Sequence, residues 1–415
     1  MTEDEIYRTS TQYRLWSFTP EKLASLRNST NALAAERVKA AIKKSRESGQ
    51  AQPAASADSS GFSTPLGENG QANGSAHGDK DAEVETLTVD EERMLVEYYC
   101  SQAKTIGEAK EFSFPIHVIA TAVQFMKRFY LSNSPMTYHP RVIMMTSLYF
   151  ATKTEPHYMG LDKYVRNLQS GLGKKKKVTN EDILAPEFIL TQGIRFTFDV
   201  KHPFHALRGV HMEMQAMVEG QAALLPGEGR TAKEVQEAMQ ALPPKDGAML
   251  QDSAAALRKR LDDAYGQAKL TLGSAGILTD AYFLYTPSQI MFASLLLADE
   301  ALTSFYLSTK FPSATSASTI FPKVMATIRL CAEMLQSFEQ LGRDELIRID
   351  KKIYKCQNPE KVDLVSLNRA QKRDETVDGK LDESVAKRRK LEREKSMREG
   401  EDIFGPQLEK NGAGG

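Results

Sequence analysis

Three histidines near the middle of the chain are the residues best suited to metal chemistry. His202 and His205 have an HxxH spacing, and His211 follows shortly after. A zinc site needs three or four ligands, but the sequence offers neither a third ligand of matching spacing nor a carboxylate partner. We therefore expect ordinary histidines at a helix start beside Pro203, and no metal.

The cysteines and the nucleophile motifs do not indicate an independent active site. Cys100, Cys331 and Cys356 are far apart and form no CxxC pair. This pattern favours small core residues in a reducing compartment. The motifs GxxxxGK[ST], GxSxG and HExxH do not occur, so the sequence lacks the usual phosphate loop, hydrolase nucleophile and zinc-protease helix. An independent active site therefore finds no support in the sequence, and we expect no cofactor.

Two runs of basic residues could contact an acidic partner. Lys174–Lys177 lies in an expected loop, where it either contacts nucleic acid or an acidic protein or is simply solvated. Lys387–Lys390 reads Lys-Arg-Arg-Lys, which is typical of a nuclear-import signal or of a plain charged tail. The chain has 54 basic and 54 acidic residues, a balance that argues against a globally basic nucleic-acid binder.

The elements that carry these residues must be folded in water. The chain has 415 residues, 41% of them hydrophobic, and this length suggests two to four domains. Its longest apolar runs, Val142–Ala151 and Ile290–Ala298, are about ten residues long, whereas a membrane span needs about 20. We therefore expect buried core helices and no membrane contact. The acidic start Met-Thr-Glu-Asp-Glu does not resemble a secretory signal.

Helix-start signals and biased composition divide the first part of the chain. In Thr19-Pro20-Glu21 the threonine can cap a helix that begins at the proline. Thr88-Val-Asp-Glu91 is a capping box. Residues 46–85 are rich in Ser, Gly, Ala, Gln and Asn without apolar periodicity, so we expect a disordered insert. The charge-dense stretch 363–415 is expected to be a disordered tail.

Apolar periodicity predicts two groups of helices and no strand of useful length. The first group is expected at about 90–105, 115–131, 140–153, 161–168 and 180–197. Its second and third members are apolar on nearly every face, which is typical of helices inside a bundle. The second group is expected at about 203–218, 248–271, 276–283, 287–299, 301–309 and 321–341, followed by a helix near 343–355. The Pro- and Gly-rich stretch 219–247 predicts a surface loop with one short helix near 231–241.

An internal repeat relates the two groups. Tyr138–Ala151 and Tyr285–Ala298 share Tyr, Pro, Ile, Met, Ser, Leu and Ala at matching positions. Both segments place a proline in the first helical turn and continue into a buried helix. The repeat predicts a duplicated helical domain.

Three segments carry longer motifs. Ser10–Thr19 reads Ser-Thr-Gln-Tyr-Arg-Leu-Trp-Ser-Phe-Thr, Phe125–Arg141 reads Phe-Met-Lys-Arg-Phe-Tyr-Leu-Ser-Asn-Ser-Pro-Met-Thr-Tyr-His-Pro-Arg, and Leu278–Ile290 reads Leu-Thr-Asp-Ala-Tyr-Phe-Leu-Tyr-Thr-Pro-Ser-Gln-Ile. With the repeat, these motifs resemble the cyclin family, most closely its C/H-like branch. The second motif is similar to the signature of the first cyclin box, the third to that of the second box, and the first to the N-terminal helix.

The resemblance implies an all-α fold of tandem cyclin boxes, two five-helix repeats, with flanking N- and C-terminal helices. The expected parts are an N-terminal helical segment (1–45), a disordered insert (46–85), a first box (86–200), a second box (201–342) with the loop insertion 219–247, a C-terminal helix (343–362) and a disordered charged tail (363–415).

The resemblance also implies a function. In the family, the first box packs against the regulatory helix of a cyclin-dependent kinase and seats its Glu against the phosphate-anchoring Lys. The C/H-like branch implies a non-catalytic subunit of the CDK-activating kinase in the nucleus. Its expected partners are the kinase catalytic subunit, a RING-finger assembly factor and the core of general transcription factor IIH, and its substrates are other cyclin-dependent kinases and the RNA polymerase II C-terminal domain.

The family's kinase-facing pair maps to Lys153 and Glu187. In the family these side chains converge and bond the kinase main chain at the base of its regulatory helix; from the residues alone they could be ordinary solvated charges. Pro186 should kink the fifth helix or delay its start, which leaves the orientation of Glu187 open. Glu300 occupies the place of Lys153 in the second repeat, so only the first repeat has the pair.

The resemblance suggests four further kinase contacts. Phe150, Phe196 and Phe198 occupy positions of apolar contacts, although they could equally be interior. Trp16 lies on a helix that in the family folds back on the first box, and a plain packing anchor is the alternative.

A second departure from the family pattern, besides Pro186, lies in the first helix of the first box, and two alternative interpretations remain. Glu91 and Glu92 stand where cell-cycle cyclins carry the Met-Arg of a substrate-docking patch, so that patch is expected to be absent. One alternative is another transcriptional cyclin. The other is a nucleic-acid-binding tandem cyclin-fold protein resembling general transcription factor IIB, which should show a basic face and usually a zinc ribbon. Neither feature is visible, so we expect no direct specific nucleic-acid binding.

Overall fold

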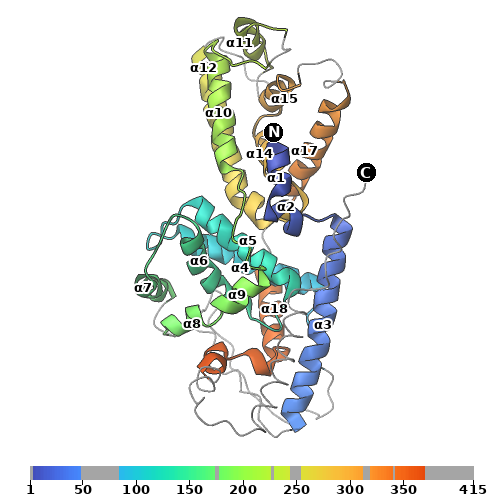
Figure 1. Ribbon diagram of the computed structural model, residues 1–415, viewed down its shortest axis with the longest axis vertical. Coiled ribbons are helices and arrows are strands. Elements are labelled where there is room, and N and C mark those ends of the chain that lie inside the picture. Colours follow the sequence, from blue (N-terminus) through green and yellow to red (C-terminus); the bar gives the residue numbers. More distant parts are fainter. Residues whose placement is uncertain are drawn as a thin grey trace. The chain divides into compact units, whose positions relative to one another are not determined.

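The computed structural model describes residues 3–47, 84–172, 177–225, 229–243, 254–311, 318–339 and 342–369. Within these ranges the regular elements are helices, so the all-α prediction is confirmed (Figure 1). The expectations for residues 48–83, for Lys174–Lys176 and for the chain beyond 369, including Lys387–Lys390, lie outside the described residues.

The chain divides into two compact units, and neither is continuous in sequence. The first-repeat unit comprises Pro20–Phe198 and Leu341–Gly415, and the second-repeat unit comprises Met1–Thr19 and Asp199–Gln340. The N-terminal segment that we expected as one piece is therefore shared between the units.

Two buried helices form the core of the first-repeat unit. The described helices are α3 (Pro20–Glu47), α4 (Val89–Glu108), α5 (Ile116–Ser132), α6 (Pro140–Thr154), α7 (Leu161–Leu172), α8 (Asn180–Leu184), α9 (Glu187–Gly193) and α18 (Arg343–Lys355). Every residue of α5 from Val118 to Leu131 is buried, and α6 packs along it. Helices that are apolar all round need such neighbours, so the expected positions of both core helices are confirmed.

Local signals place several helix starts as expected. Helix α3 begins at Pro20, and Thr88 and Glu91 form a complete capping box at the start of α4. Helix α3 extends through Glu47, two residues into the stretch expected to be disordered. Lys44 and Arg46 lie in its last turn, where basic side chains interact favourably with the helix dipole.

The second-repeat unit surrounds one buried helix. Its described helices are α1 (Glu3–Thr9), α2 (Thr11–Trp16), α10 (Phe204–Val218), α11 (Ala232–Gln240), α12 (Ala254–Thr271), the π-helical turn η2 (Leu272–Gly276), α13 (Ala281–Leu284), α14 (Pro287–Ala298), α15 (Glu300–Ser308) and α17 (Phe321–Gln336). The central α14 packs on α12 and α17. Helix α11 confirms the short helix expected within 219–247.

The helix expected at 276–283 is not continuous. A π turn at Leu272–Gly276 reaches only the first residue of this range, a bend and a turn interrupt it at 279–280, and the four-residue α13 follows. The Ser274 hydroxyl donates to the carbonyl of Leu270 at 2.8 Å, and the Thr279 hydroxyl donates to that of Ala275 at 2.8 Å. Hydroxyls that bond back to helix carbonyls compete with the regular ladder, which apolar periodicity cannot reveal.

Residues 342–369 form a strap on the first-repeat unit, which we call the C-terminal strap. It contains α18, a 3-10 turn η3 (Pro359–Lys361) and a helix at 364–369. The tail was expected to be disordered from 363, and this boundary is wrong for residues 364–369. Leu364 is buried, and Asp363 caps the helix by accepting from the Ser366 N–H at 2.9 Å, so the short segment has both an anchor and a cap.

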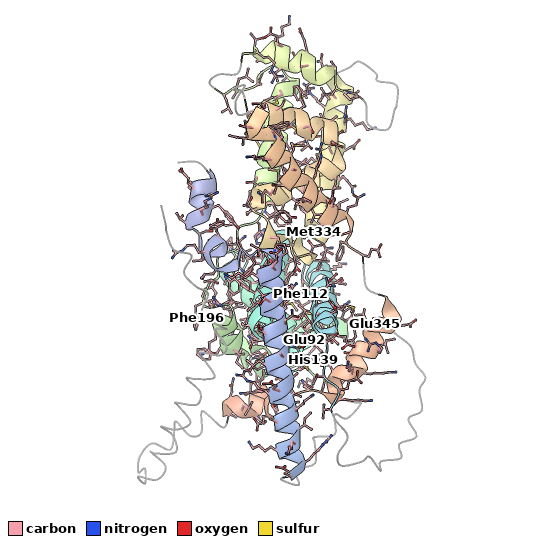
Figure 2. All side chains as sticks on the ribbon, turned by 90° about the vertical axis from the view of Figure 1, so that its right-hand side faces the viewer. Glu92, Phe112, His139, Phe196, Met334 and Glu345 are labelled. Atoms are coloured by element: carbon pink, nitrogen blue, oxygen red, sulfur yellow. The ribbon has the colours of Figure 1, made fainter. Side chains whose placement is uncertain are left out.

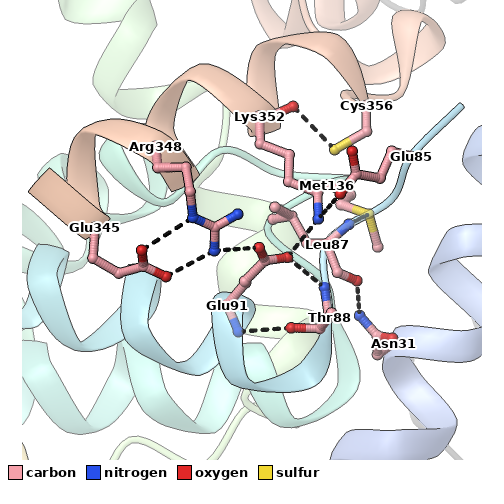
Figure 3. Close-up of polar contacts among 10 residues, drawn as sticks. All are labelled: Asn31, Glu85, Leu87, Thr88, Glu91, Met136, Glu345, Arg348, Lys352 and Cys356. Atoms are coloured by element: carbon pink, nitrogen blue, oxygen red, sulfur yellow. Dashed lines mark hydrogen bonds and ion pairs between the residues drawn. The ribbon is translucent and has the colours of Figure 1, made fainter.

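The strap is pinned to α4 by a buried carboxylate. Glu91 accepts from Arg348 at 2.6 Å and from Lys352 at 2.8 Å (Figure 3). Ile349 and Ile353 of α18 are fully buried beside these polar contacts. Helix α18 therefore covers the face of α4 on which Glu91 lies.

Candidate functional site

Lys153 and Glu187 lie together at the edge of the first-repeat unit. Lys153 is in the last turn of α6, and Glu187 is the first residue of α9. The Lys153 Nζ is 2.8 Å from both carboxylate oxygens of Glu187, and the two side chains are 30% and 23% exposed. The same Nζ lies 4.6 Å from the ring centroid of Tyr149. The pair is therefore formed in the free chain and keeps a face toward solvent.

Pro186 determines where Glu187 lies. The structure breaks the helix expected at 180–197 into α8 and α9, and Pro186 is the N-cap of α9. A proline has no N–H to donate and its ring crowds the preceding turn, so a continuous helix was the wrong prediction and the expected late start is observed. The break places Glu187 in the first turn of α9, opposite the end of α6.

The three phenylalanines expected at the site differ in exposure. Phe150 is buried, and its ring packs 5.7 Å from Phe125 and 5.2 Å from Phe198. Phe198 is partly exposed, and Phe196 is 52% exposed (Figure 2). Phe150 thus belongs to the core beneath the site, whereas Phe196 and Phe198 offer apolar surface.

The backbone that presents Phe196 is unusual. Arg195 has a φ of 56° and Phe196 has a φ of 52°, in the left-handed region that costs about 1 kcal/mol or more for residues other than glycine. Strain of this kind concentrates at functional sites. Here it turns the chain after α9 so that a bulky aromatic ring faces solvent.

Sequence reasoning missed three exposed apolar residues near the pair. Phe188 is 64% exposed, Tyr158 is 78% exposed, and Leu184 is also exposed. Burial is the main cause that raises the pKa of Tyr149, and Tyr158 and Glu187 contribute further, which places both close to Tyr149. A signal for two of them was present in the sequence: Leu184 and Phe188 are apolar residues four positions apart, on either side of Pro186. We call Tyr158, Leu184, Phe188, Phe196 and Phe198 the rim patch.

The second repeat has the opposite charge at the matching place. Glu300 is the first residue of α15 and pairs with Arg329 at 2.9 Å, with both side chains more than half exposed. The neighbouring Asp299 is instead buried and accepts two bonds from Arg260, at 2.7 Å and 2.9 Å. Only the first repeat therefore carries a lysine–glutamate pair at this position.

Trp16 lies in the second-repeat unit together with the rest of residues 1–19. The side chain is buried, at 3% exposure. Gln12 of the same helix accepts from the Lys201 N–H at 2.7 Å, and the Phe18 N–H donates to the carbonyl of Phe283 at 2.8 Å. These long-range bonds fix the segment to 199–340, and the burial of Trp16 indicates a packing anchor.

The histidines and cysteines are engaged separately. His202 lies 2.9 Å from the Tyr282 hydroxyl and His211 lies 2.9 Å from Asp262. In the described part of the chain, no three His, Cys, Asp or Glu residues are grouped so as to hold a metal ion. All three cysteines are buried, and burial raises the pKa of Cys331 to about 12 and that of Cys356 to about 11, so these thiols stay protonated.

The two α4 residues at the position of the cell-cycle docking patch make contacts inside the protein. Glu91 and Glu92 are both buried. Glu91 holds the C-terminal strap, while Glu92 accepts from the Ser134 hydroxyl and from Asn31. No helix among the described residues is both long and apolar enough to cross a bilayer.

Known proteins of one family resemble this chain. A family model described as the cyclin C-terminal domain matches residues 202–336. The cyclin CCL1 of Saccharomyces cerevisiae is 28% identical over 320 residues, which are 75% of this chain and 63% of that protein. Cyclin-H1-1 of Arabidopsis thaliana is 28% identical over 300 residues, 71% of each chain. The chain therefore spans less than two thirds of the length of the Saccharomyces relative.

A solved structure matches over nearly the whole chain. It is the structure of the CAK complex from Chaetomium thermophilum bound to ATP-gamma-S, one chain of which is 30% identical with a TM-score of 0.65. The match covers 92% of this chain and 98% of that chain. The tandem-box architecture expected from the internal repeat is thus confirmed.

Proposed function

The chain belongs to the cyclin family, and we propose that it is an H-type regulatory cyclin that binds and activates a cyclin-dependent protein kinase. The observation that carries this proposal is the preformed Lys153–Glu187 pair, with its partly exposed carboxylate and ammonium groups. Exposed rings of the rim patch lie near it: Phe188 follows Glu187 in α9, and Tyr158 is close to Tyr149, whose ring the Lys153 ammonium group contacts. Charged groups that can bond a partner's main chain beside apolar anchors are typical of a specific protein interface.

The proposed activation is a shift between two arrangements of the kinase. A surface that binds only the active arrangement stabilises it by its differential affinity. To move a 1:99 equilibrium to 99:1 requires about 5.5 kcal/mol. A patch that is already formed before binding supplies this at a lower ordering cost. Helices α6 and α9 carry the two charged residues, and the left-handed turn at Arg195–Phe196 presents the aromatic ring.

We further infer that the chain acts within a CDK-activating kinase module associated with general transcription factor IIH, in the nucleus. Its partners would be the kinase subunit, a RING-finger assembly factor and the transcription-factor core, and the RNA polymerase II C-terminal domain would be a substrate of the kinase. The chain itself would be non-catalytic. The resemblance to a chain of the Chaetomium CAK complex supports this assignment.

Affinity purification of the full chain tests the proposal. We expect a cyclin-dependent kinase to co-purify, and its activity on an RNA polymerase II C-terminal-domain peptide to depend on the chain. Absence of any kinase, or salt-dependent binding of the purified chain to DNA in its place, would contradict the proposal and favour the nucleic-acid-binding alternative.

A further inference from the structure

Helix α8, which precedes the kinase-binding carboxylate, is held by side chains that bond its backbone. The Thr146 hydroxyl of α6 donates to the carbonyl of Ile183 at 2.9 Å, and both residues are fully buried. A second bond comes from the C-terminal strap, where the side-chain amide of Asn368 donates to the carbonyl of Ala185 at 3.0 Å. Residues distant in sequence thus fix the end of α8.

The Ala185 carbonyl lies at the break between two helices. The first backbone bond beyond the break joins the Leu190 N–H to the Pro186 carbonyl at 2.8 Å, and α9 begins at Glu187. Carbonyls at a helix end need a partner from outside the helix. Asn368 supplies that partner for the residue two positions before Glu187.

The part of the strap that carries Asn368 is itself anchored to the first-repeat unit. Leu364 is buried, Asp363 caps the 364–369 helix through Ser366, and Arg369 pairs with Glu181 at the start of α8. Both ends of α8 are therefore attached to one turn of the strap.

Apolar packing does not hold this corner tightly. A cavity of about 210 Å³ lies between the strap and the α8–α9 corner, and its lining includes Ala185, Pro186, Val362 and Leu364. The pocket is partly open to solvent, so apolar side chains cover only part of the corner. The hydrogen bond from Asn368 thus has more influence on the corner than it would have in a close-packed region.

We propose that Asn368 is a positioning residue for Glu187: through the Ala185 carbonyl it holds the α8–α9 corner so that Glu187 meets Lys153 in the geometry that the kinase recognises. This inference rests on the proposed function, because it concerns the same interface. It makes the C-terminal strap part of the binding site although none of its residues touches Lys153 or Glu187 in the structure.

A double-mutant cycle on the full chain tests the proposal. Asn368→Asp keeps the shape of the side chain but replaces the donor by an acceptor that faces the carbonyl. We expect the affinity for the co-purifying kinase to fall about 5- to 30-fold, which is about 1–2 kcal/mol. In a Glu187→Ala background the same change should cost less than about 2-fold, because a residue that acts through another has no effect once that partner is absent. Leu367→Ala, an exposed side chain on the same turn that makes no contact used in this argument, is the control and should bind normally.

Three results separate the possibilities. Equal losses in both backgrounds would show a general structural role and overturn the inference, as would normal binding by Asn368→Asp. If the wild-type chain binds no kinase, the proposed function itself fails. Should Asn368→Asp lower the melting temperature, Asn368→Ala, which only removes the donor, is subjected to the same cycle and the same criteria.

Discussion

The Glu92 carboxylate accepts a hydrogen bond from the Ser134 hydroxyl inside the first-repeat unit, where Glu92 is only 8% exposed. No basic side chain contributes to its stabilisation, in contrast to the neighbouring Glu91. Burial raises the pKa of Glu92 from 4.5 to about 7, although the bonds from Ser134 and Asn31 lower it somewhat. A carboxyl group on α4 therefore titrates near neutral pH.

The first prediction is that Glu92 makes the fold less stable as the pH rises. Because the folded pKa lies above the unfolded one, its stabilising effect is complete below pH 4.5 and is lost as the pH rises through about 7. At 1.36 kcal/mol per pKa unit, the loss is about 3 kcal/mol. Glu92→Gln should remove this loss, so its stability relative to wild type should rise by that amount between pH 5 and pH 8 in urea unfolding.

The comparison must be made as a difference, because His139 has the opposite effect. Burial lowers the pKa of His139 from 6.5 to about 4, so its contribution is present above pH 6.5 and is lost as the pH falls. Asp90→Asn, an exposed change on the same helix, is the control. Equal pH slopes for Glu92→Gln and wild type would contradict the prediction.

The second prediction concerns Lys153 and Glu187, the pair that we propose binds the kinase. Lys153→Ala or Glu187→Ala removes a partly exposed ion pair, which stabilises a fold by about 1 kcal/mol or less. Charged groups bonded in an interface cost about 2–5 kcal/mol when truncated, so kinase affinity should fall by about 30-fold or more. The double variant should lose less than the sum of the singles, since the two residues are in contact.

Glu300→Ala is the matched control for this pair, because Glu300 lies at the equivalent place in the second repeat and pairs only with exposed groups. It should fold and bind normally. If Lys153→Ala and Glu187→Ala both bind the kinase with wild-type affinity, the assignment of the family's kinase-facing pair to these two positions is wrong. Unfolding of both would make the pair structural instead.

The third prediction separates contact from strain at Phe196. Phe196→Gly fits the left-handed backbone without cost but removes an exposed ring. We expect unfolding free energy to stay within about 1 kcal/mol of wild type, since relief of strain and the greater freedom of the unfolded chain offset each other. Kinase affinity should fall about 10-fold, as for an interface aromatic. Leu330→Ala removes an exposed apolar side chain on α17 and is the control. It should change neither the unfolding free energy nor the kinase affinity.

The fourth prediction concerns the anchor of the C-terminal strap. Lys352→Ala leaves buried Glu91 with Arg348 as its remaining cationic partner, and a buried charge that loses a partner is costly. We expect a loss of about 2–3 kcal/mol in unfolding free energy. Arg348→Ala should cost less, since half of that side chain is exposed. Lys351→Ala, on the solvent face of α18, is the control and should leave the unfolding free energy unchanged. Equal losses at all three positions would contradict the prediction.

Local chemistry in the sequence was enough to place most helices. Capping boxes, such as the one at Thr88, and prolines in the first helical turn act within a few residues, so they appear in the sequence as they do in the structure. Pro186 predicted the helix break, because the effect of a proline on a helix is also local. The sequence could also bring Lys153 and Glu187 together, but only through a family resemblance, because 34 positions separate them.

Features that depend on contacts between distant segments could not be predicted. Trp16 is fixed to the second-repeat unit by the neighbours of Gln12 and Phe18, which lie far along the chain. The helix at 364–369 is too short to form alone and depends on the burial of Leu364. The exposure of Phe188 depends on which face α9 presents, and a seven-residue helix gives little periodicity to read.

The interleaving of the two units has a consequence for synthesis on the ribosome. Residues 1–19 emerge first, but their partners at 199–340 are translated only after almost the entire first-repeat unit. The first-repeat unit in turn lacks α18 and its strap until residues 342–369 have left the exit tunnel. Domains usually fold in order as they emerge, at about 5–20 residues per second. Here each unit must wait for a late segment, so a prematurely terminated chain leaves one or both units incomplete, and nascent helices with exposed apolar faces are substrates for chaperones.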